Sequence, residues 1–281
     1  MTAPRVELPT IALIGAGSMG RAILAGLLAP HVEVVGGIRV TNRDPARAAD
    51  FDSETRVTAL TTGENPNANR DAVVGAPIVV IGVKPAMVTG VLDEIADVLE
   101  PHALIISVAA GISTRTMEAH LSGGQPVVRT MPNTPATVGR AVTGISGGTR
   151  VTPDDLELAV RLFDTVGDVL VIEEDRIDAL GSISGSGPAY VFYFVEQFVR
   201  VAEAKGFTRE QAELLVRGTF RGAIDLLEAS GESPEELRRR VTSPGGSTER
   251  AIAVFDEADI HKIFVAATDA AVARQREMGT S

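Results

Sequence analysis

The feature that most constrains this chain is a glycine-rich loop between an apolar run and an apolar helical pattern. The run Thr10–Ile14 is followed by the letters GAGSMG, which fit the pattern G-x-G-x-x-G. Gly15 allows the tight turn, Gly17 lets the backbone approach a pyrophosphate, and Gly20 lets the following helix pack closely on the strand. Free N–H groups at the start of that helix favour an anion. The loop therefore predicts dinucleotide binding; a glycine turn needed only for packing is the alternative.

Short apolar runs alternate with amphipathic stretches from Thr10 to about Glu173. The runs expected to be strands are Thr10–Ile14, Gly36–Thr41, Val57–Ala59, Ile78–Gly82, Ala103–Ser107, Val127–Met131, Val142–Ser146 and Val169–Ile172. Helical patterns between them include Met19–Leu28, Ala86–Leu99 and Asp154–Val166. Such alternation predicts a mostly parallel sheet with helices on both faces. The expected fold class is α/β plus all-α, with an N-terminal Rossmann-type doubly wound domain (residues 1–173) followed by a helical dimerisation domain (residues 174–281).

The turn after the second expected strand indicates which dinucleotide is bound. A site for NAD usually places an acidic residue there, on the ribose 2′-hydroxyl. Here Asn42 and Arg43 occupy the turn, and an amide with a guanidinium suits a 2′-phosphate. Asp44 complicates this interpretation, although it can instead cap the helix that Pro45 opens. We therefore expect NADPH as the cofactor, with NADH as the alternative.

Two further loops follow expected strands at the edge of the sheet where doubly wound folds bind ligands. They are Gly82–Pro85 and Ala109–Gly111, and both can line the nicotinamide side. Lys84 is one of only three lysines in the chain. A surface lysine before a proline turn is an equal alternative for it.

Helical signals replace the strand pattern after about Asp175. Thr208–Gln211 fits a capping box, and the long apolar stretch 188–205 predicts a buried helix, part of which we expect to pack against a second subunit. The loop Ser243–Thr248 combines consecutive backbone N–H groups, two hydroxyls and the dipole of the next helix. This combination would hold a carboxylate. A long capped turn between helices explains the loop equally well.

Composition narrows the class of protein. The 281 residues carry a formal net charge of −11 and include no cysteine. An acidic surface repels nucleic-acid phosphates and anionic lipids, and the lack of thiols excludes disulfides and thiolate metal sites. The first residues show no apolar core of a signal peptide, and no run approaches the roughly 18 apolar residues of a membrane span. We expect a cytoplasmic enzyme with a small-molecule substrate, and with no metal, nucleic-acid or membrane partner.

Several motifs together resemble the pyrroline-5-carboxylate reductase family. IGAGSMG, VKPAM, AAGIS, RTMPNTPA, SGSGPAYVF and SPGGST occur in the order and spacing of that family, from about Thr10 to the end. The resemblance implies reduction of L-1-pyrroline-5-carboxylate to L-proline, the last step of proline synthesis, with NAD(P)H giving a hydride to C5 of the C=N bond. It also implies homodimers with interleaved C-terminal helices, often arranged further into decamers, and active sites that take residues from two subunits.

The resemblance also implies the residues of the site. The cofactor contacts would be Ile14, Gly15, Ala16, Gly17, Ser18, Met19, Asn42, Arg43, Asn69, Gly82, Val83, Lys84, Pro85, Ala109, Ala110 and Gly111. The substrate carboxylate would be held by Gly246, Ser247 and Thr248. Tyr193 stands where some relatives carry a threonine proposed as proton donor, so that role is not transferred. No catalytic residue is assigned, because solvent can protonate the basic substrate nitrogen, and we expect catalysis mainly by positioning.

Three alternative functions remain open. A β-hydroxyacid dehydrogenase shares the two-domain plan but needs a lysine or histidine on its interdomain helix, where this chain has only Lys205 at the end. A reductase of another imine or amino acid is the second. A catalytically silent NADP-sensing protein is the third, and it would leave the SPGG loop without a purpose.

Overall fold

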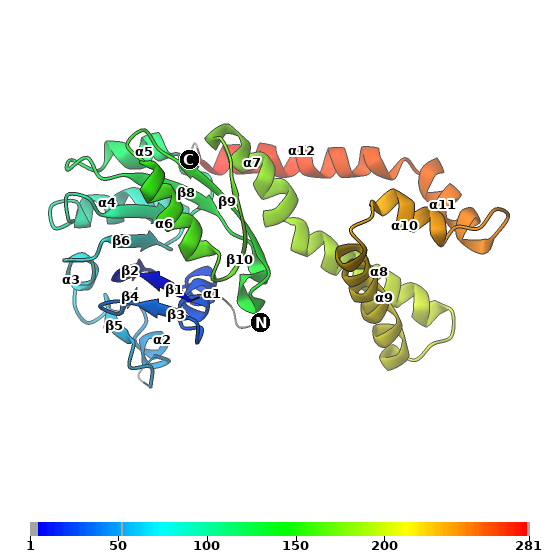
Figure 1. Ribbon diagram of the computed structural model, residues 1–281, viewed down its shortest axis with the longest axis horizontal. Coiled ribbons are helices and arrows are strands. Elements are labelled where there is room, and N and C mark those ends of the chain that lie inside the picture. The colour runs from blue at the N-terminus through cyan, green and yellow to red at the C-terminus, as the bar shows by residue number, and fades with distance from the viewer. Residues whose placement is uncertain (1–4, 52, 280–281) are drawn as a thin grey trace. The chain divides into compact units, whose positions relative to one another are not determined.

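The computed structural model describes residues 5–51 and 53–279, which fall into two compact units. The first unit runs to Ser186 and includes the chain from Ala271 onward, and the second comprises Gly187–Ala270. Strands occur in the first unit, whereas the described residues of the second form helices and turns (Figure 1). The expected combination of an α/β part and an all-helical part is therefore confirmed.

The first unit is built on an eight-stranded sheet. Its strands are β2 (Ile11–Ile14), β4 (Ile38–Asn42), β5 (Val57–Thr61), β6 (Ile78–Ile81), β7 (Leu104–Ser107), β8 (Val127–Met131), β9 (Ala141–Gly147) and β10 (Gly167–Val171). They lie in the order β10-β9-β8-β7-β6-β2-β4-β5, and all neighbours are parallel except β8 and β9. The strand order runs outward from β2 in both directions, which is the doubly wound arrangement of dinucleotide-binding folds. The prediction of a mostly parallel sheet is confirmed.

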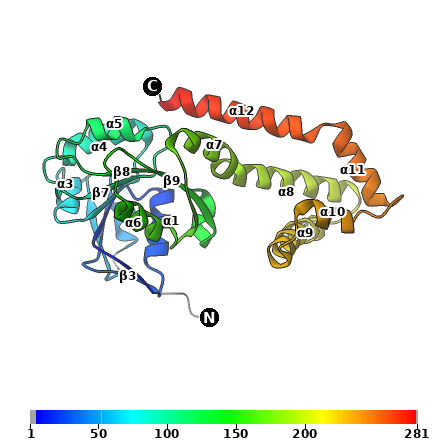
Figure 2. The ribbon, with the colours of Figure 1, turned by 45° about the horizontal axis from the view of Figure 1, so that its top comes forward.

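Helices cover both faces of this sheet. Those of the first unit are α1 (Ser18–Leu27), α2 (Pro45–Ala49), α3 (Ala68–Val73), α4 (Val88–Ile95), α5 (Thr114–Ala119), α6 (Pro153–Phe163) and α7 (Ile177–Leu180), with the 3-10 helices η1 (Pro85–Met87), η2 (Thr134–Val138) and η3 (Glu174–Arg176) and the π-helix η4 (Gly181–Gly185). Leu13 packs in one core with α1 and α6, and its neighbour Ile14 packs in a second core with α3, α4 and α5 (Figure 2). Because successive side chains of a strand point to opposite faces, one short sequence supplies both cores.

The antiparallel pair at β8 and β9 follows from a short connection. Prolines at 132 and 135 stop β8, η2 follows, and Gly139 turns the chain back in the left-handed region at φ 68°. Asn133 then ties this turn to its surroundings. Its Oδ1 accepts a hydrogen bond from the Val142 N–H at 3.0 Å, and its Nδ2 donates to the Ser184 carbonyl at 2.9 Å. An antiparallel pair needs no long crossover, so this compact turn is sufficient.

Some elements differ from the expectations. A second sheet pairs β1 (Val6–Leu8) with β3 (Val32–Val34), and three-residue strands carry too little periodicity to be predicted. The expected helix Ala86–Leu99 is instead η1 followed by α4, which ends at Ile95. Helices α3 and α5 were not expected, because six residues show little amphipathic pattern.

The second unit consists of helices. They are α8 (Gly187–Ala204), α9 (Arg209–Ser230), α10 (Pro234–Arg240), α11 (Ser247–Glu257) and the first part of α12 (Ile260–Gly279). The predicted capping box is confirmed: Thr208 accepts from the Gln211 N–H, and Gln211 accepts from the Thr208 N–H at 3.0 Å. No helix within the described residues is long and apolar enough to cross a membrane.

The second unit has a small core of its own. Its core cluster contains the buried residues Val199, Ala212 and Val216. Val199 is the buried residue of α8, while Phe192 on the same helix is 68% exposed and Leu214 on α9 is 75% exposed. The expectation of a buried helix at 188–205 is therefore wrong for the single chain. Large apolar side chains exposed together in this way are typical of a surface that another protein covers.

Candidate dinucleotide site

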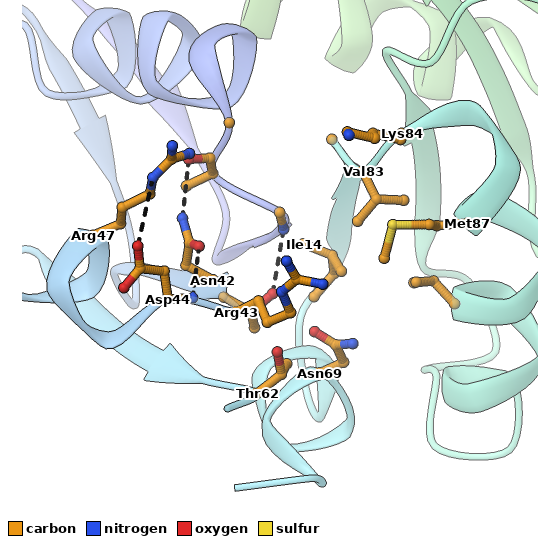
Figure 3. Close-up of a pocket in the computed structure, with 16 residues that line it drawn as sticks. Ile14, Asn42, Arg43, Asp44, Arg47, Thr62, Asn69, Val83, Lys84 and Met87 are labelled. Carbon is orange, nitrogen blue, oxygen red and sulfur yellow. Dashed lines mark hydrogen bonds and ion pairs between the residues drawn. The ribbon is translucent and has the colours of Figure 1, made fainter. Parts of the chain in front are cut away.

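A cavity of about 490 Å³ opens at the carboxyl ends of β2, β4 and β6 in the first unit (Figure 3). Doubly wound sheets bind their ligands at this edge, where the strand order reverses. The residues that line the cavity are Ile14, Gly15, Ala16, Gly17, Thr41, Asn42, Arg43, Asp44, Arg47, Thr62, Asn69, Gly82, Val83, Lys84, Met87 and Val91.

The three glycines of the first loop are needed for different structural reasons. Gly15 has φ 89°, and a Cβ there would lie 2.8 Å from Val83 Cγ1. A Cβ on Gly20 would lie 2.9 Å from the Gly15 carbonyl oxygen. A Cβ on Gly17, by contrast, would meet no atom within 4 Å. Packing within the chain therefore requires Gly15 and Gly20, whereas Gly17 leaves space open beside the cavity for the approach of a ligand.

The start of α1 is prepared for an anion. Gly17 is the N-cap residue, no side chain caps the helix, and its first turn has no acidic residue. The first N–H groups of a helix lack partners within the helix, and the helix dipole adds positive potential at this end. A pyrophosphate fits this arrangement, because it would accept from these N–H groups without a competing carboxylate.

The turn after β4 is braced by side chains. Asn42 donates from Nδ2 to the Ala16 carbonyl at 3.2 Å, and its Oδ1 accepts from the Asp44 N–H at 3.1 Å. Asp44 caps α2 by accepting from the Ala46 N–H at 3.0 Å, and its other carboxylate oxygen lies 3.9 Å from Arg47 Nε. The acid is thus used as a helix cap, which is the second of the two roles considered for it.

Three cations line the cavity of a protein that is acidic overall. Arg43 and Lys84 are exposed and make no ion pair with the residues that the structure describes. Arg47 was not predicted for the site. It lies in the first turn of α2, so the pattern of a capping aspartate followed by proline could have placed its guanidinium beside the turn. Together these charges favour a phosphate-bearing ligand.

Asn69 provides an unsatisfied acceptor at the cavity wall. The residue is 7% exposed, and its Nδ2 donates to Glu94 Oε2 at 3.0 Å. Its Oδ1 is buried without a hydrogen-bond partner in the described structure, and Figure 3 shows the side chain beside the cavity. A buried acceptor left unpaired costs free energy, so a ligand that donates a hydrogen bond here would relieve it.

The other predicted contacts do not line the cavity. Ser18 and Met19 form the first turn of α1, and Pro85 opens η1. The loop Ala109–Gly111 follows β7, whose neighbour β6 leads into Gly82–Lys84. Both segments therefore lie at the same edge of the sheet. The unpredicted lining residues Thr41, Thr62 and Val91 belong to no motif that would have identified them, whereas Met87 is the last residue of VKPAM.

The predicted carboxylate loop lies in the second unit. Gly246 is the N-cap of α11 and makes no side-chain cap, and Ser247 and Thr248 are the first residues of that helix. Gly245 adopts φ 71°, and its N–H donates to Glu249 Oε2 at 2.8 Å. The start of α11 thus presents uncapped N–H groups beside two hydroxyls, which is the arrangement that the sequence predicts.

A doubly wound sheet with a glycine loop at its switch point defines the class: a dinucleotide-binding α/β protein. Over 273 residues the chain is 37% identical to the pyrroline-5-carboxylate reductase of Corynebacterium melassecola, in a match that covers 96% of this chain and 98% of that protein. The chain belongs to the pyrroline-5-carboxylate reductase family, as the motifs predict.

Further comparisons agree with this assignment. Family models described as "NADP oxidoreductase coenzyme F420-dependent" and "Pyrroline-5-carboxylate reductase dimerisation" match residues 10–111 and 174–278. The structure of a pyrroline-5-carboxylate reductase from Coxiella burnetii is similar, with a TM-score of 0.87, 37% identity, and coverage of 96% of this chain and 98% of that one. A Plasmodium falciparum pyrroline carboxylate reductase with NADP bound has a TM-score of 0.82 at 24% identity, over 96% of this chain and 98% of that one, which shows the shared fold.

Proposed function

We propose that this chain reduces L-1-pyrroline-5-carboxylate to L-proline with NADPH, as the last step of proline biosynthesis. The observation that carries the proposal is the likeness to named reductases over 96% of the chain, which includes both the glycine loop and the SPGG loop. A silent NADP sensor would leave the SPGG loop without a purpose, and a β-hydroxyacid dehydrogenase would need a lysine or histidine where this chain has only Lys205.

Residues of the first unit fit NADPH. The cofactor supplies a hydride when bound. The uncapped start of α1 would hold the pyrophosphate, while Arg43 and Arg47 would hold the ribose 2′-phosphate, since guanidinium groups match phosphate oxygens. Asn69 would accept a hydrogen bond through its unpaired Oδ1. Gly82–Pro85 and Ala109–Gly111 would border the nicotinamide.

Residues of the second unit fit the substrate carboxylate. Gly246 and the first residues of α11, Ser247 and Thr248, would donate backbone and hydroxyl hydrogen bonds to it. These contacts would orient the substrate ring, and orientation alone can supply several kcal/mol of catalysis. We assign no general acid, because the substrate nitrogen can take its proton from water.

A homodimer, assembled further into decamers, is proposed as the working form. Residues 174–278 match a dimerisation model, and the exposed apolar side chains of α8, α9 and α12 need a protein surface to cover them. These include Phe192, Leu214, Ile224 and Phe264. We further propose a domain boundary at residues 173 and 174, and a cytoplasmic location.

The direct test is turnover. Purified protein, NADPH and pyrroline-5-carboxylate should yield proline, measured by mass spectrometry, with loss of absorbance from the cofactor. Omission of the substrate is the control, and NADH in parallel ranks the cofactors. Binding of NADPH without any proline would instead support the silent sensor, and oxidation of a β-hydroxyacid with NADP⁺ would support the dehydrogenase.

A further inference from the structure

A cluster of charged side chains, with a buried arginine and two partly exposed carboxylates, lies in the first unit, outside the cavity. Arg129 stands on β8 with its side chain 8% exposed. Its Nη2 donates to Asp178 Oδ1 at 2.6 Å, and its Nη1 lies 3.5 Å from Glu174 Oε1. The two carboxylates belong to α7 and η3, which follow one another in the chain, so one guanidinium joins β8 to a segment that lies 45 or more residues later.

Glu174 also accepts hydrogen bonds from a fourth element, α5. Its Oε1 accepts from the Thr114 N–H at 2.7 Å, and its Oε2 accepts from the Thr114 hydroxyl at 2.6 Å. Thr114 is 4% exposed and is the first residue of α5. A carboxylate that accepts from both donors of one residue fixes the position and the direction of that residue.

Thr114 lies three positions after a loop of the proposed site. Ala109–Gly111 begins directly after Val108, whose N–H donates to the Ile81 carbonyl at 3.1 Å. The sheet therefore holds the residue before the loop, and Glu174 holds Thr114, which lies three positions after it. Gly111 lies between the two anchors at φ 79°, in the left-handed region, where the chain has no side chain to restrain it.

Stability alone does not account for the cluster. Replacing buried ion pairs by apolar side chains is often neutral or stabilising, because desolvation of the charges offsets their attraction. Arg129 also has a buried Nε without a hydrogen-bond partner in the described structure. A hydrogen-bonded carboxylate supplies a defined direction, which an apolar contact does not.

We propose that Glu174, oriented by Arg129, is a positioning residue that holds the loop Ala109–Gly111 against the nicotinamide through Thr114. The inference rests on the proposed function, since the place of this loop beside the nicotinamide is part of it. Loss of the hydrogen bonds between Glu174 and Thr114 would misalign the hydride donor and the imine carbon, while the adenosine half of the cofactor stays bound in the cavity.

The chain offers a matched control for this test. Glu118 holds Thr149 in the same way, through the Thr149 N–H at 2.6 Å and the Thr149 hydroxyl at 2.9 Å, and neither residue lines the cavity. Thr114→Val and Thr149→Val each remove one hydroxyl donor and keep the shape of the side chain. Glu174→Gln and Glu118→Gln form a second matched pair, which replaces Thr114→Val if that variant does not fold.

Two measurements decide the proposal. Thr114→Val should lower kcat about tenfold, with the KM for NADPH changed less than about twofold, and should raise the kinetic isotope effect with deuterated NADPH. Hydrogen–deuterium exchange of the amides at 109–113 should become faster without any ligand. Thr149→Val should match the wild type in each measurement.

Unchanged exchange at 109–113, or equal kinetics for the two threonine variants, would overturn the positioning role. Absence of turnover by the wild type would instead refute the proposed function. In that case the exchange measurement still decides whether Glu174 holds the loop, so the two failures are distinguishable.

Discussion

A methyl group on Gly15 would lie 2.8 Å from Cγ1 of Val83, which is closer than carbon atoms pack in proteins. The loop after β2 and the loop after β6 can therefore lie this close together only because residue 15 has no side chain. Two residues further on, Gly17 has no such neighbour within 4 Å. One motif therefore contains a glycine needed for packing and a glycine whose space is left for a ligand.

This difference predicts that alanine at position 15 lowers the stability of the fold, whereas alanine at position 17 weakens the binding of NADPH. Gly15→Ala should lower the free energy of unfolding by about 1–3 kcal/mol, because φ 89° and the contact with Val83 both strain a Cβ. Gly17→Ala should unfold at nearly the wild-type temperature but bind NADPH at least about tenfold more weakly. Thermal unfolding and fluorescence titration measure the two. Unchanged NADPH affinity in Gly17→Ala would show that the open space is not used.

Arg43→Ala should separate the two cofactors. Loss of a charge-assisted hydrogen bond to the 2′-phosphate costs about 1.5–3 kcal/mol, so the Kd for NADPH should rise roughly 10- to 100-fold while that for NADH stays within about twofold. Arg115→Ala, an exposed arginine on α5 away from the cavity, is the control. An equal loss for both cofactors would remove the argument for 2′-phosphate recognition.

Thr248→Ala tests the carboxylate loop. We expect the KM for pyrroline-5-carboxylate to rise at least about tenfold, since one hydrogen bond to a charged carboxylate contributes about 1.5–3 kcal/mol, while the KM for NADPH is retained. Thr242→Ala serves as the control, because the Thr242 hydroxyl donates to the Arg238 carbonyl within its own turn. A substrate KM that does not move in Thr248→Ala contradicts the proposed contact.

Asp164 makes the stability depend on pH. Burial raises the pKa of Asp164 above its ordinary value of 3.8, and the nearby charge of Asp168 raises it further. A carboxyl with a raised pKa in the folded state destabilises the fold once it is ionised, and the penalty disappears as the pH falls below 3.8. Asp164→Asn should therefore raise the unfolding temperature at pH 7, the more so because Asp164 ends α6, where a negative charge opposes the helix dipole.

The same comparison at low pH supplies the control. The difference between Asp164→Asn and the wild type should shrink as the pH approaches 3.8. A difference in unfolding temperature that is constant from neutral to acidic pH would mean that the charge of Asp164 is not its cause.

The exposed apolar face of the second unit predicts a dependence of oligomer size on Leu214, which is 75% exposed. Leu214→Arg would place a charge where a second copy is expected to cover apolar surface, so the dimer should dissociate at micromolar concentration. Light scattering after gel filtration measures the mass. Glu228→Arg, an exposed polar position on the same helix, should leave the mass unchanged. A fully dimeric Leu214→Arg variant would exclude this face as the interface.

How far the site could be predicted depends on the range of the interactions involved. The sequence pattern predicted Gly15, Gly17, Asn42, Arg43 and Lys84 near the nucleotide, and the structure places all five on one cavity. Their roles toward NADPH remain predictions. Arg47 was not predicted as a site residue, because its position depends on where α2 begins. Asn69 was suggested by the family resemblance alone. An isolated asparagine has no local pattern that distinguishes a site residue from a surface residue.

The sequence by itself determined the order of strands and helices, the glycine turn and the helix caps, because periodicity and backbone preferences act over a few neighbouring residues. The reversal of direction between β8 and β9 and the hydrogen bonds of Glu174 to Thr114 were decided only by the tertiary structure. Such contacts depend on which segments the folded sheet brings together. Residues 114 and 174 are sixty positions apart, and no local pattern relates them. Neighbouring residues thus determine the cofactor loop, whereas contacts between distant segments determine how the proposed active site is supported.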